Sequence, residues 1–372
     1  MFLRKYFLWP LGLLYGLIME IRNFFYDYHY FSVYQSKIFT ISVGNLSVGG
    51  TGKTPHIEYL IRYFLDRGYN IAVLSRGYGR KTNGFIEVLT HHQSSEVGDE
   101  PLQIKQKFLH QVSVFVCENR VLGVKKIENI KQKIDVLLLD DAFQHRSIQP
   151  HLQIVLSDFE HLIDQDWVLP AGNLREFPYQ LKRADLILIT KTPKDLKLEI
   201  REQKIKNLKN LNSKIKNIPI LFTKIVYGNF FDLKNRAEFC SSIFLTEKIE
   251  KYVIFLITGI AKSAYFCEDL KLEIQNKHQI LLEMIHWDFP DHHVFSFQDV
   301  EKINHKIQQI KMKYRQENIQ FYVLTTEKDA VKLANFDFLD QKIYFRAIQI
   351  DFLTQNMHDQ FQNYLEKKYK KN

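Results

Sequence analysis

The sequence predicts an α/β fold in which a mainly parallel sheet is flanked by helices, with a smaller C-terminal α/β lobe and an apolar N-terminal helix. From Lys37 onward, short apolar, β-branched runs alternate with longer amphipathic stretches, as strands alternate with crossover helices. A glycine-rich turn follows the first run, and two aspartates follow a later one, where open sheets bind ligands. With 372 residues, 45% of them hydrophobic, the chain is long enough to bury a core in each lobe.

The elements divide into three segments. Residues 1–36 are predicted to be an apolar, membrane-associated helix, residues 37–216 the core, and residues 217–372 the C-terminal α/β lobe. A lysine-rich stretch at 194–216 separates the last two segments, and we assign it no role. The predicted strands are 38–43, 71–74, 112–116, 136–139, 154–156, 186–189, 218–222, 253–257, 322–324 and 343–345.

The N-terminal segment is the most apolar part of the chain. Arg4 and Lys5 precede an apolar run over 6–19 that contains Pro10 and Gly12. A spanning helix needs about 20 apolar residues, so this shorter run favours a helix that lies at the membrane interface. A helix that crosses the bilayer, a signal peptide and a helix packed on the protein core remain alternatives.

Charge and cysteine content narrow the class of protein. Lys and Arg number 51 against 42 acidic residues, a formal charge of +9, which suits a nucleic acid, an anionic membrane surface or a polyphosphate ligand. The lysine-rich stretches do not interleave aromatic residues with glycines, so we interpret them as solvated or membrane-proximal surfaces and expect no nucleic acid. Three cysteines without a CxxC pair indicate neither a disulfide framework nor a cysteine-rich zinc site, which fits the cytoplasm.

A phosphate-binding loop is predicted at residues 44–55, which read Gly-Asn-Leu-Ser-Val-Gly-Gly-Thr-Gly-Lys-Thr-Pro between a strand and the helical pattern at 56–65. Strand, glycine-rich turn and helix follow in the order of a P-loop. Lys53 is expected to reach the β- and γ-phosphates, and the Thr54 hydroxyl to bind Mg²⁺. The residues expected to surround the phosphate oxygens are Ser47, Val48, Gly49, Gly50, Thr51 and Gly52. Ser47 departs from the general motif, which has a glycine there.

A second acidic element follows the apolar run at 136–139. Asp140 and Asp141 stand at the end of this predicted strand, where one of them can hold the metal directly or through water. Which of the two does so stays open, and a purely structural role in capping the next turn is the alternative.

Beyond the phosphates, the residues favour a small-molecule kinase. Residues 190–193 read Thr-Lys-Thr-Pro, with proline where a guanine-binding motif needs aspartate, and Val48 replaces the leading lysine of partition ATPases. Further polar clusters stand at strand ends or in loops, where sites gather: 75–80, 98–101, 141–146, 172–176 and 289–295. A zinc site at the last cluster is an alternative, although no third ligand stands at metal spacing.

These motifs together resemble the tetraacyldisaccharide 4'-kinase family, the lipid A 4'-kinases. The resemblance rests on Gly-Asn-Leu and Gly-Gly-Thr-Gly-Lys-Thr-Pro within 44–55, Ser-Arg-Gly-Tyr-Gly at 75–79, Gly-Asp-Glu-Pro at 98–101, Asp-Asp-Ala-Phe-Gln-His at 140–145, Leu-Pro-Ala-Gly at 169–172 and Phe-Pro-Asp-His-His at 289–293. It implies ATP-dependent phosphorylation of the 4'-hydroxyl of tetraacyldisaccharide 1-phosphate in lipid A biosynthesis, at the cytoplasmic face of the inner membrane.

The resemblance also implies roles for individual residues. Asp99, paired with His292, would activate the sugar hydroxyl, beside Lys53 and Thr54 on the triphosphate. The metal site would be completed by Asp140, Asp141 and Glu176, and the further nucleotide or phosphate contacts would be Tyr78, Arg175 and His145. A helix-capping role for Asp99 stays open, as does an exchange of roles between His293 and His292.

Two other functions remain alternatives. One is a membrane-associated P-loop ATPase that regulates a partner, and the other is a kinase of another lipid-linked sugar. The sequence indicates no obligatory protein partner.

Overall fold

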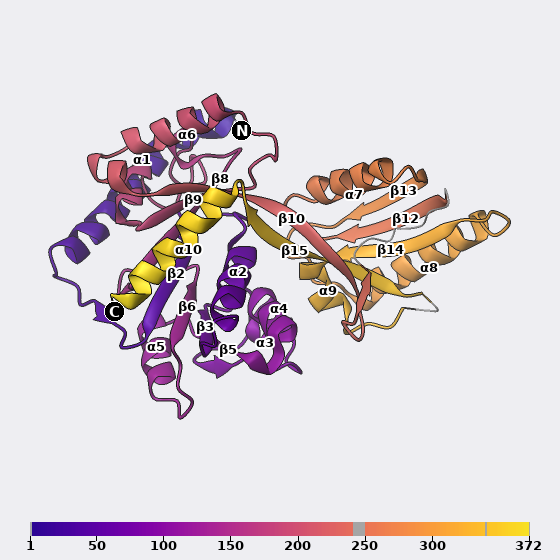
Figure 1. The fold of residues 1–372 in the computed structure, drawn as a ribbon, viewed down its shortest axis with the longest axis horizontal. Helices are drawn as coiled ribbons and strands as arrows, with labels where there is room; N and C mark the ends of the chain where they lie inside the picture. Colours follow the sequence, from indigo (N-terminus) through magenta and orange to yellow (C-terminus); the bar gives the residue numbers. More distant parts are fainter. Residues whose placement is uncertain (1, 241–249, 339–340, 372) are drawn as a thin grey trace. The chain divides into compact units, whose positions relative to one another are not determined.

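The computed structural model describes residues 2–240, 250–338 and 341–371 (Figure 1). The chain divides into two compact units: Met1–Val226 with Gln349–Asn372, and Tyr227–Ile348. Strands β10 (Ile220–Asp232) and β15 (Ile343–Phe352) each run from one unit into the other. The sequence predicts a boundary at 216/217 and a second lobe that extends to residue 372. By contrast, the last residues of the chain belong to the first unit, because β15 returns there.

The first unit contains a sheet with the strand order β10-β9-β8-β2-β6-β3-β5-β4. All pairs are parallel except that of β4 with β5. The strands after β10 are β9 (Leu186–Thr190), β8 (Leu152–Asp158), β2 (Phe39–Asn45), β6 (Val136–Asp140), β3 (Ile71–Ser75), β5 (Val112–Val116) and β4 (Ile86–Glu87). Every residue of β2, β3, β6 and β9 is buried, as expected when helices cover both faces of a parallel sheet.

Helices complete this unit. They are α1 (Phe2–Asp27), α2 (Lys53–Leu65), α3 (Ser94–Val97), α4 (Asp99–Phe108), α5 (Arg120–Glu128), α6 (Leu198–Asn210) and α10 (Gln355–Lys370), with short 3-10 turns at Leu109–Gln111, Ile163–Gln165, Pro178–Arg183 and Ser213–Asn217. A small parallel pair joins β1 (Tyr34–Gln35) to β7 (Ile148–Gln149). The C-terminal helix α10 packs on α2, where the rings of Tyr59 and Phe361 lie 5.8 Å apart. The predicted fold class is therefore confirmed.

Helix α1 docks through a narrow face. A Cβ at Gly12 would lie 3.0 Å from the Cβ of Ala171, and one at Gly16 would overlap the ring of Phe177, so these glycines permit close packing. Farther along the helix, two polar residues bond to either side of Phe177 in the sequence: the Asn23 amide donates to Glu176 at 3.3 Å, and Glu20 accepts from Gln180 at 2.7 Å. Among the described residues, no helix combines the length and apolarity needed to cross a membrane.

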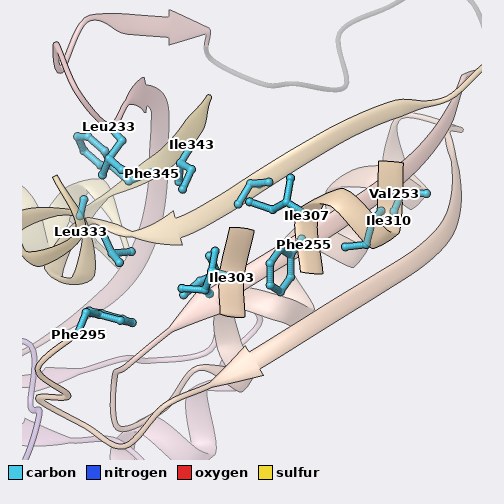
Figure 2. Close-up of a cluster of buried hydrophobic side chains, with 13 residues drawn as sticks. Leu233, Val253, Phe255, Phe295, Ile303, Ile307, Ile310, Leu333, Ile343 and Phe345 are labelled. Carbon is cyan, nitrogen blue, oxygen red and sulfur yellow. The ribbon is translucent and has the colours of Figure 1, made fainter. Parts of the chain in front are cut away.

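The second unit contains parallel strands in the order β13-β12-β14-β15. Its strands are β13 (Ile280–Asp288), β12 (Lys251–Thr258) and β14 (Gln320–Thr326), with β11 (Glu238–Cys240) antiparallel to β10; its helices are α7 (Ala264–Asn276), α8 (Phe297–Lys313) and α9 (Glu327–Leu333). Ile303, Ile307 and Ile310 recur at helical spacing on α8 and point toward Phe255 of β12 (Figure 2). This buried cluster fixes α8 on the sheet.

Candidate functional site

The phosphate loop connects β2 to α2. Gly49 and Gly52 have φ of 104° and 86°, in the left-handed region that favours glycine. A Cβ at Gly49 or Gly50 would meet no atom within 4 Å, so open space lies beside the loop. A Cβ at Gly44 would lie 2.8 Å from the Cβ of Phe143, which explains a glycine inside a buried strand. The glycines thus shape a loop whose backbone is accessible to a ligand.

Residues at the ends of strands β2 and β9 hydrogen-bond to the phosphate loop. The Asn45 amide donates to the Thr51 hydroxyl at 2.9 Å, and the Thr190 hydroxyl to the carbonyl of Thr51 at 2.9 Å. Lys191 bonds to the carbonyl of Gly50 and, at 2.9 Å, to Asp158. Carbonyls are turned toward the protein by these contacts, which suits a loop that offers its N–H groups to an anion.

Residues 173–175 pair with the first residues of the phosphate loop. Ser47 forms an antiparallel bridge with Leu174, and the Val48 N–H donates to the carbonyl of Asn173 at 2.8 Å. The Arg175 N–H donates to the carbonyl of Leu46 at 2.7 Å. The predicted cluster at 172–176 is therefore adjacent to the phosphate loop, through contacts that sequence spacing does not reveal.

Asp140 ends strand β6 and is buried beside β3. Its Oδ2 accepts from the Ser75 hydroxyl at 3.0 Å, and its buried Oδ1 has no hydrogen-bond partner among the described residues. Burial, together with the charges of Glu100 and Asp141, raises the pKa of Asp140 to about 7. A buried carboxylate oxygen without a donor is a position suited to a cation.

Asp141 has a different environment. It adopts φ 47°, and its carboxylate lies 3.8 Å from Lys53 Nζ and accepts from Arg175 Nη1 at 3.0 and 3.1 Å. Burial alone would raise the pKa of this carboxyl, but Lys53 and Arg175 lower it overall. Lys53, Asp141 and Arg175 are thus brought together as predicted residues of one site.

Arg120 and Ser75 are site residues that the sequence analysis does not assign. The guanidinium of Arg120 is buried and donates to the carbonyl of Asp140 at 3.0 Å and to that of Cys117 at 2.5 Å. Burial lowers the pKa of Arg120 to about 10 and that of His145 to about 4. No motif surrounds Arg120, whereas Ser75 stands in the quoted cluster at 75–80, and a strand-end position is the signal that could have identified it.

Asp99 opens helix α4, behind Gly98 at the N-cap. A Cβ at Gly98, which has φ 93°, would lie 3.1 Å from both the Cα of Gly77 and the carbonyl of Tyr78. The 75–80 loop therefore packs on the start of α4, while the Tyr78 side chain is largely exposed. Asp99 is half-buried, and its catalytic role remains a prediction.

Glu176 is fully buried and holds other elements together. Its Oε2 accepts from Arg183 and from Asn23 of α1, and burial raises its pKa. The contacts link the segment beside the phosphate loop to the N-terminal helix, and its metal role remains a prediction. Within the described residues, the group whose ligand atoms all lie within 4.8 Å of one another is Asp158, Glu160 and His161, and Asp158 already pairs with Lys191.

His292 belongs to the second unit. It follows β13 in a turn with φ 60°, and its Nε2 lies 3.0 Å from the ammonium of Lys328. The neighbouring His293 is bonded to Asp299 at 3.1 Å and stacks on Phe289, with ring centroids 4.6 Å apart. His293 therefore has contacts that maintain the local fold. Because Asp99 and His292 belong to different units, their pairing remains a prediction.

Comparison with known proteins gives consistent matches along nearly the whole chain. The family model described as "Tetraacyldisaccharide-1-P 4'-kinase" matches residues 4–369. A tetraacyldisaccharide 4'-kinase of Bacteroides thetaiotaomicron is 35% identical, with 96% of this chain and 91% of the relative covered. One of Flavobacterium psychrophilum is 39% identical, with 90% and 88% covered.

A solved structure has the same fold. The LpxK protein of Aquifex aeolicus, crystallised with ATP, superposes with a TM-score of 0.70 over 98% of this chain and 99% of that chain, at 24% identity.

Proposed function

The chain belongs to the tetraacyldisaccharide-1-phosphate 4'-kinase family, and we propose that it transfers the γ-phosphate of ATP to the 4'-hydroxyl of a tetraacyldisaccharide 1-phosphate with the residues described above. The observation that carries the assignment of the site is the junction of the phosphate loop with Asp140 and Asp141 at adjoining strand ends. Such an arrangement places cationic and anionic groups around a triphosphate.

Lys53 and the loop perform the electrostatic part of the reaction. Lys53 would neutralise negative charge on the β- and γ-phosphates. Residues Ser47 to Gly52 would surround the phosphate oxygens at the start of α2 through N–H groups other than those of Val48 and Thr51, which donate to the carbonyls of Asn173 and Gly49. Thr190 and Lys191 keep the loop carbonyls away from the anion. Tyr78 and His145 are proposed to contact the nucleotide. We therefore expect the affinity for the ATP phosphates to depend on the backbone conformation of the loop more than on any single side chain.

The metal would be Mg²⁺, held by Thr54 and Asp140. The orphaned Oδ1 of Asp140 and the chemistry of carboxylate and hydroxyl oxygens fit this ion. Asp141, already bonded to Arg175, would act on the metal through water, and Glu176 would support the site through Arg183. When bound, Mg²⁺ would neutralise negative charge on the phosphates.

The acceptor hydroxyl is proposed to lose its proton to Asp99, with His292 orienting that carboxylate. A hydroxyl becomes a stronger nucleophile as its proton leaves, and positioned general bases contribute roughly a hundredfold to ten-thousandfold. His293 is bonded to Asp299 and stacked on Phe289 within the second unit, and the role is assigned to His292 on the family motif.

Association with the cytoplasmic face of the inner membrane is part of the proposal. The residues Phe7, Leu11, Leu14, Ile18, Ile21 and Phe25 recur every three or four positions on α1, and all are exposed. Such a stripe normally packs against protein, so its exposure supports insertion into the interface beside a lipid substrate. Basic side chains near the surface would add attraction of about 1 kcal/mol each to anionic headgroups.

Product analysis tests this function. Purified protein is incubated with ATP, Mg²⁺ and either the tetraacyldisaccharide 1-phosphate or a singly glycosylated lipid, and the position of the new phosphate is read by NMR. We expect phosphate on the 4'-oxygen of the disaccharide alone. Phosphate on the other lipid would support a kinase of another lipid-linked sugar, and ATP hydrolysis without any lipid product would support the regulatory ATPase.

A further inference from the structure

We propose that Lys328 is a positioning residue that fixes His292 in the tautomer with its proton on Nδ1, so that His292 presents an N–H donor to its catalytic partner. This inference rests on the proposed function of His292. It follows from contacts made within the second unit.

The donor and acceptor roles are set by the chemistry of lysine. Lys328 Nζ lies 3.0 Å from His292 Nε2. An ammonium group has only donors, so Nε2 must be the acceptor and the neutral ring must carry its proton on Nδ1. A proton on Nε2 would face the ammonium and lose this hydrogen bond. The remaining ring nitrogen is then a donor, which suits an interaction with a carboxylate such as that of Asp99.

Asp291 stabilises the same arrangement. Its Oδ1 accepts from Lys328 Nζ at 3.1 Å and from the backbone N–H of His292 at 3.1 Å. Its other oxygen lies 3.9 Å from His292 Nε2. One carboxylate thus holds both the lysine and the backbone of the histidine, and the charged groups that face this ring include Asp291 and Lys328.

The backbone on both sides of this contact is constrained. His292 has φ 60°, a conformation that is strained for a residue with a side chain and that recurs at functional sites. Lys328 stands in the first turn of α9, where Asp329 accepts from the Thr326 hydroxyl at 2.6 Å and from the Gly259 N–H at 2.8 Å. The lysine is therefore presented from a fixed helix start, as a positioning group requires.

The direct test is the tautomer of His292 in the unmodified protein. Long-range proton–nitrogen correlation spectra of the full-length, ¹⁵N-labelled protein at mildly alkaline pH, with His292 assigned by comparison with His292→Gln, distinguish the two tautomers. We expect Nδ1 protonated and Nε2 unprotonated. A proton on Nε2 would overturn the inference even if wild-type protein transfers phosphate to the lipid, which keeps this failure separate from a failure of the proposed function.

Kinetics of variants give a second test. Lys328→Met should lower kcat roughly tenfold to a hundredfold, part of the contribution of a general base, with the KM for ATP unchanged, and Lys328→Arg should retain more activity because it keeps a donor. The matched control is Lys313→Met, which removes a lysine bonded to Glu283 at 2.8 Å in the same unit without touching a histidine.

A double-mutant comparison separates positioning from general stabilisation. In a His292→Gln background, Lys328→Met should cause no further loss of kcat, since the lysine acts through the histidine. Equal losses in both backgrounds would overturn the inference.

Discussion

Arg175 donates from a single guanidinium nitrogen, Nη1, to both carboxylate oxygens of Asp141, at 3.0 and 3.1 Å. The backbone N–H of the same arginine bonds to the carbonyl of Leu46. One residue therefore ties the carboxyl end of β6 to the start of the phosphate loop. Because Asp141 also lies 3.8 Å from Lys53, the arginine keeps this carboxylate from closing fully on the lysine that should serve ATP.

Replacement of Arg175 should lower kcat clearly but change the free energy of unfolding only slightly. Arg175→Met leaves Asp141 with Lys53 as its cation, and we expect kcat to fall roughly tenfold, while the partly exposed ion pair contributes under about 1 kcal/mol to folding. Steady-state kinetics and thermal unfolding measure the two effects. Arg62→Met, which breaks an arginine bridge to Glu58 on α2, is the control; equal kinetic losses in both variants would contradict the role of Arg175.

Acid should destabilise the first unit through His56. Its Nδ1 lies 2.7 Å from the carbonyl of Gly52 and its Nε2 lies 2.9 Å from the Thr223 hydroxyl, and burial lowers its pKa from 6.5 to about 4 despite the bond to Gly52. A lowered histidine pKa means that the unfolded chain binds the proton first, so stability present above pH 6.5 is lost as pH falls toward 4. The loss should reach about 3 kcal/mol.

The pH dependence of unfolding free energy isolates this effect. His56→Gln should unfold with a shallower acid slope between the two pKa values than the wild type, whatever its absolute stability. His91→Gln changes an exposed histidine and should leave the wild-type slope intact. Identical slopes for wild type and His56→Gln would remove His56 as the cause.

The exposed stripe of α1 should determine binding to lipid. Replacing Leu14, Ile18 and Ile21 with glutamine removes apolar side chains that each contribute roughly 1.5–3 kcal/mol when fully buried, so flotation with anionic vesicles should drop sharply. Leu272→Gln removes an exposed apolar side chain of the second unit and serves as the control. Vesicle binding unchanged in the triple variant would exclude this stripe as the anchor.

Asp99 should act in the chemical step. Asp99→Ala is expected to lower kcat roughly a hundredfold or more, with ATP affinity nearly intact, because a base acts mainly in the transition state. Isothermal titration with ATP and turnover measurements report the two quantities, with Asp195→Ala, an exposed aspartate, as control. Weak ATP binding combined with normal turnover would reassign Asp99 to nucleotide binding.

Local patterns predicted the elements that carry the phosphate loop. The predicted strand at 112–116 coincides with β5, and the predicted strand at 38–43 begins one residue before β2. Both were recognised because buried parallel strands are continuous apolar runs. Strand β13 was not predicted, since its mostly half-buried residues include Glu283 and His286, which interrupt the apolar pattern. The apolar pattern that identifies a strand is weak where the strand is only partly buried.

Contacts between residues far apart in the chain could not be predicted from the sequence pattern. The return of the chain to the first unit after Ile348 depends on packing such as that of Phe361 on Tyr59. Arg120 contacts Asp140 because the strand order brings their two segments close together. Lys328 contacts His292 although it is 36 positions away in the sequence. Motif spacing identified the loop and the carboxylates, while their supporting residues required the fold.

Phosphoryl transfer to a lipid-linked sugar through the phosphate loop can be followed with labelled ATP. The most direct measurement follows labelled γ-phosphate from ATP to tetraacyldisaccharide 1-phosphate in detergent micelles, with wild type and Lys53→Ala compared at equal folded concentration. We expect a labelled lipid product with wild type and no such product with the variant. Labelled inorganic phosphate without labelled lipid in the wild type, or equal lipid product in both proteins, would contradict it.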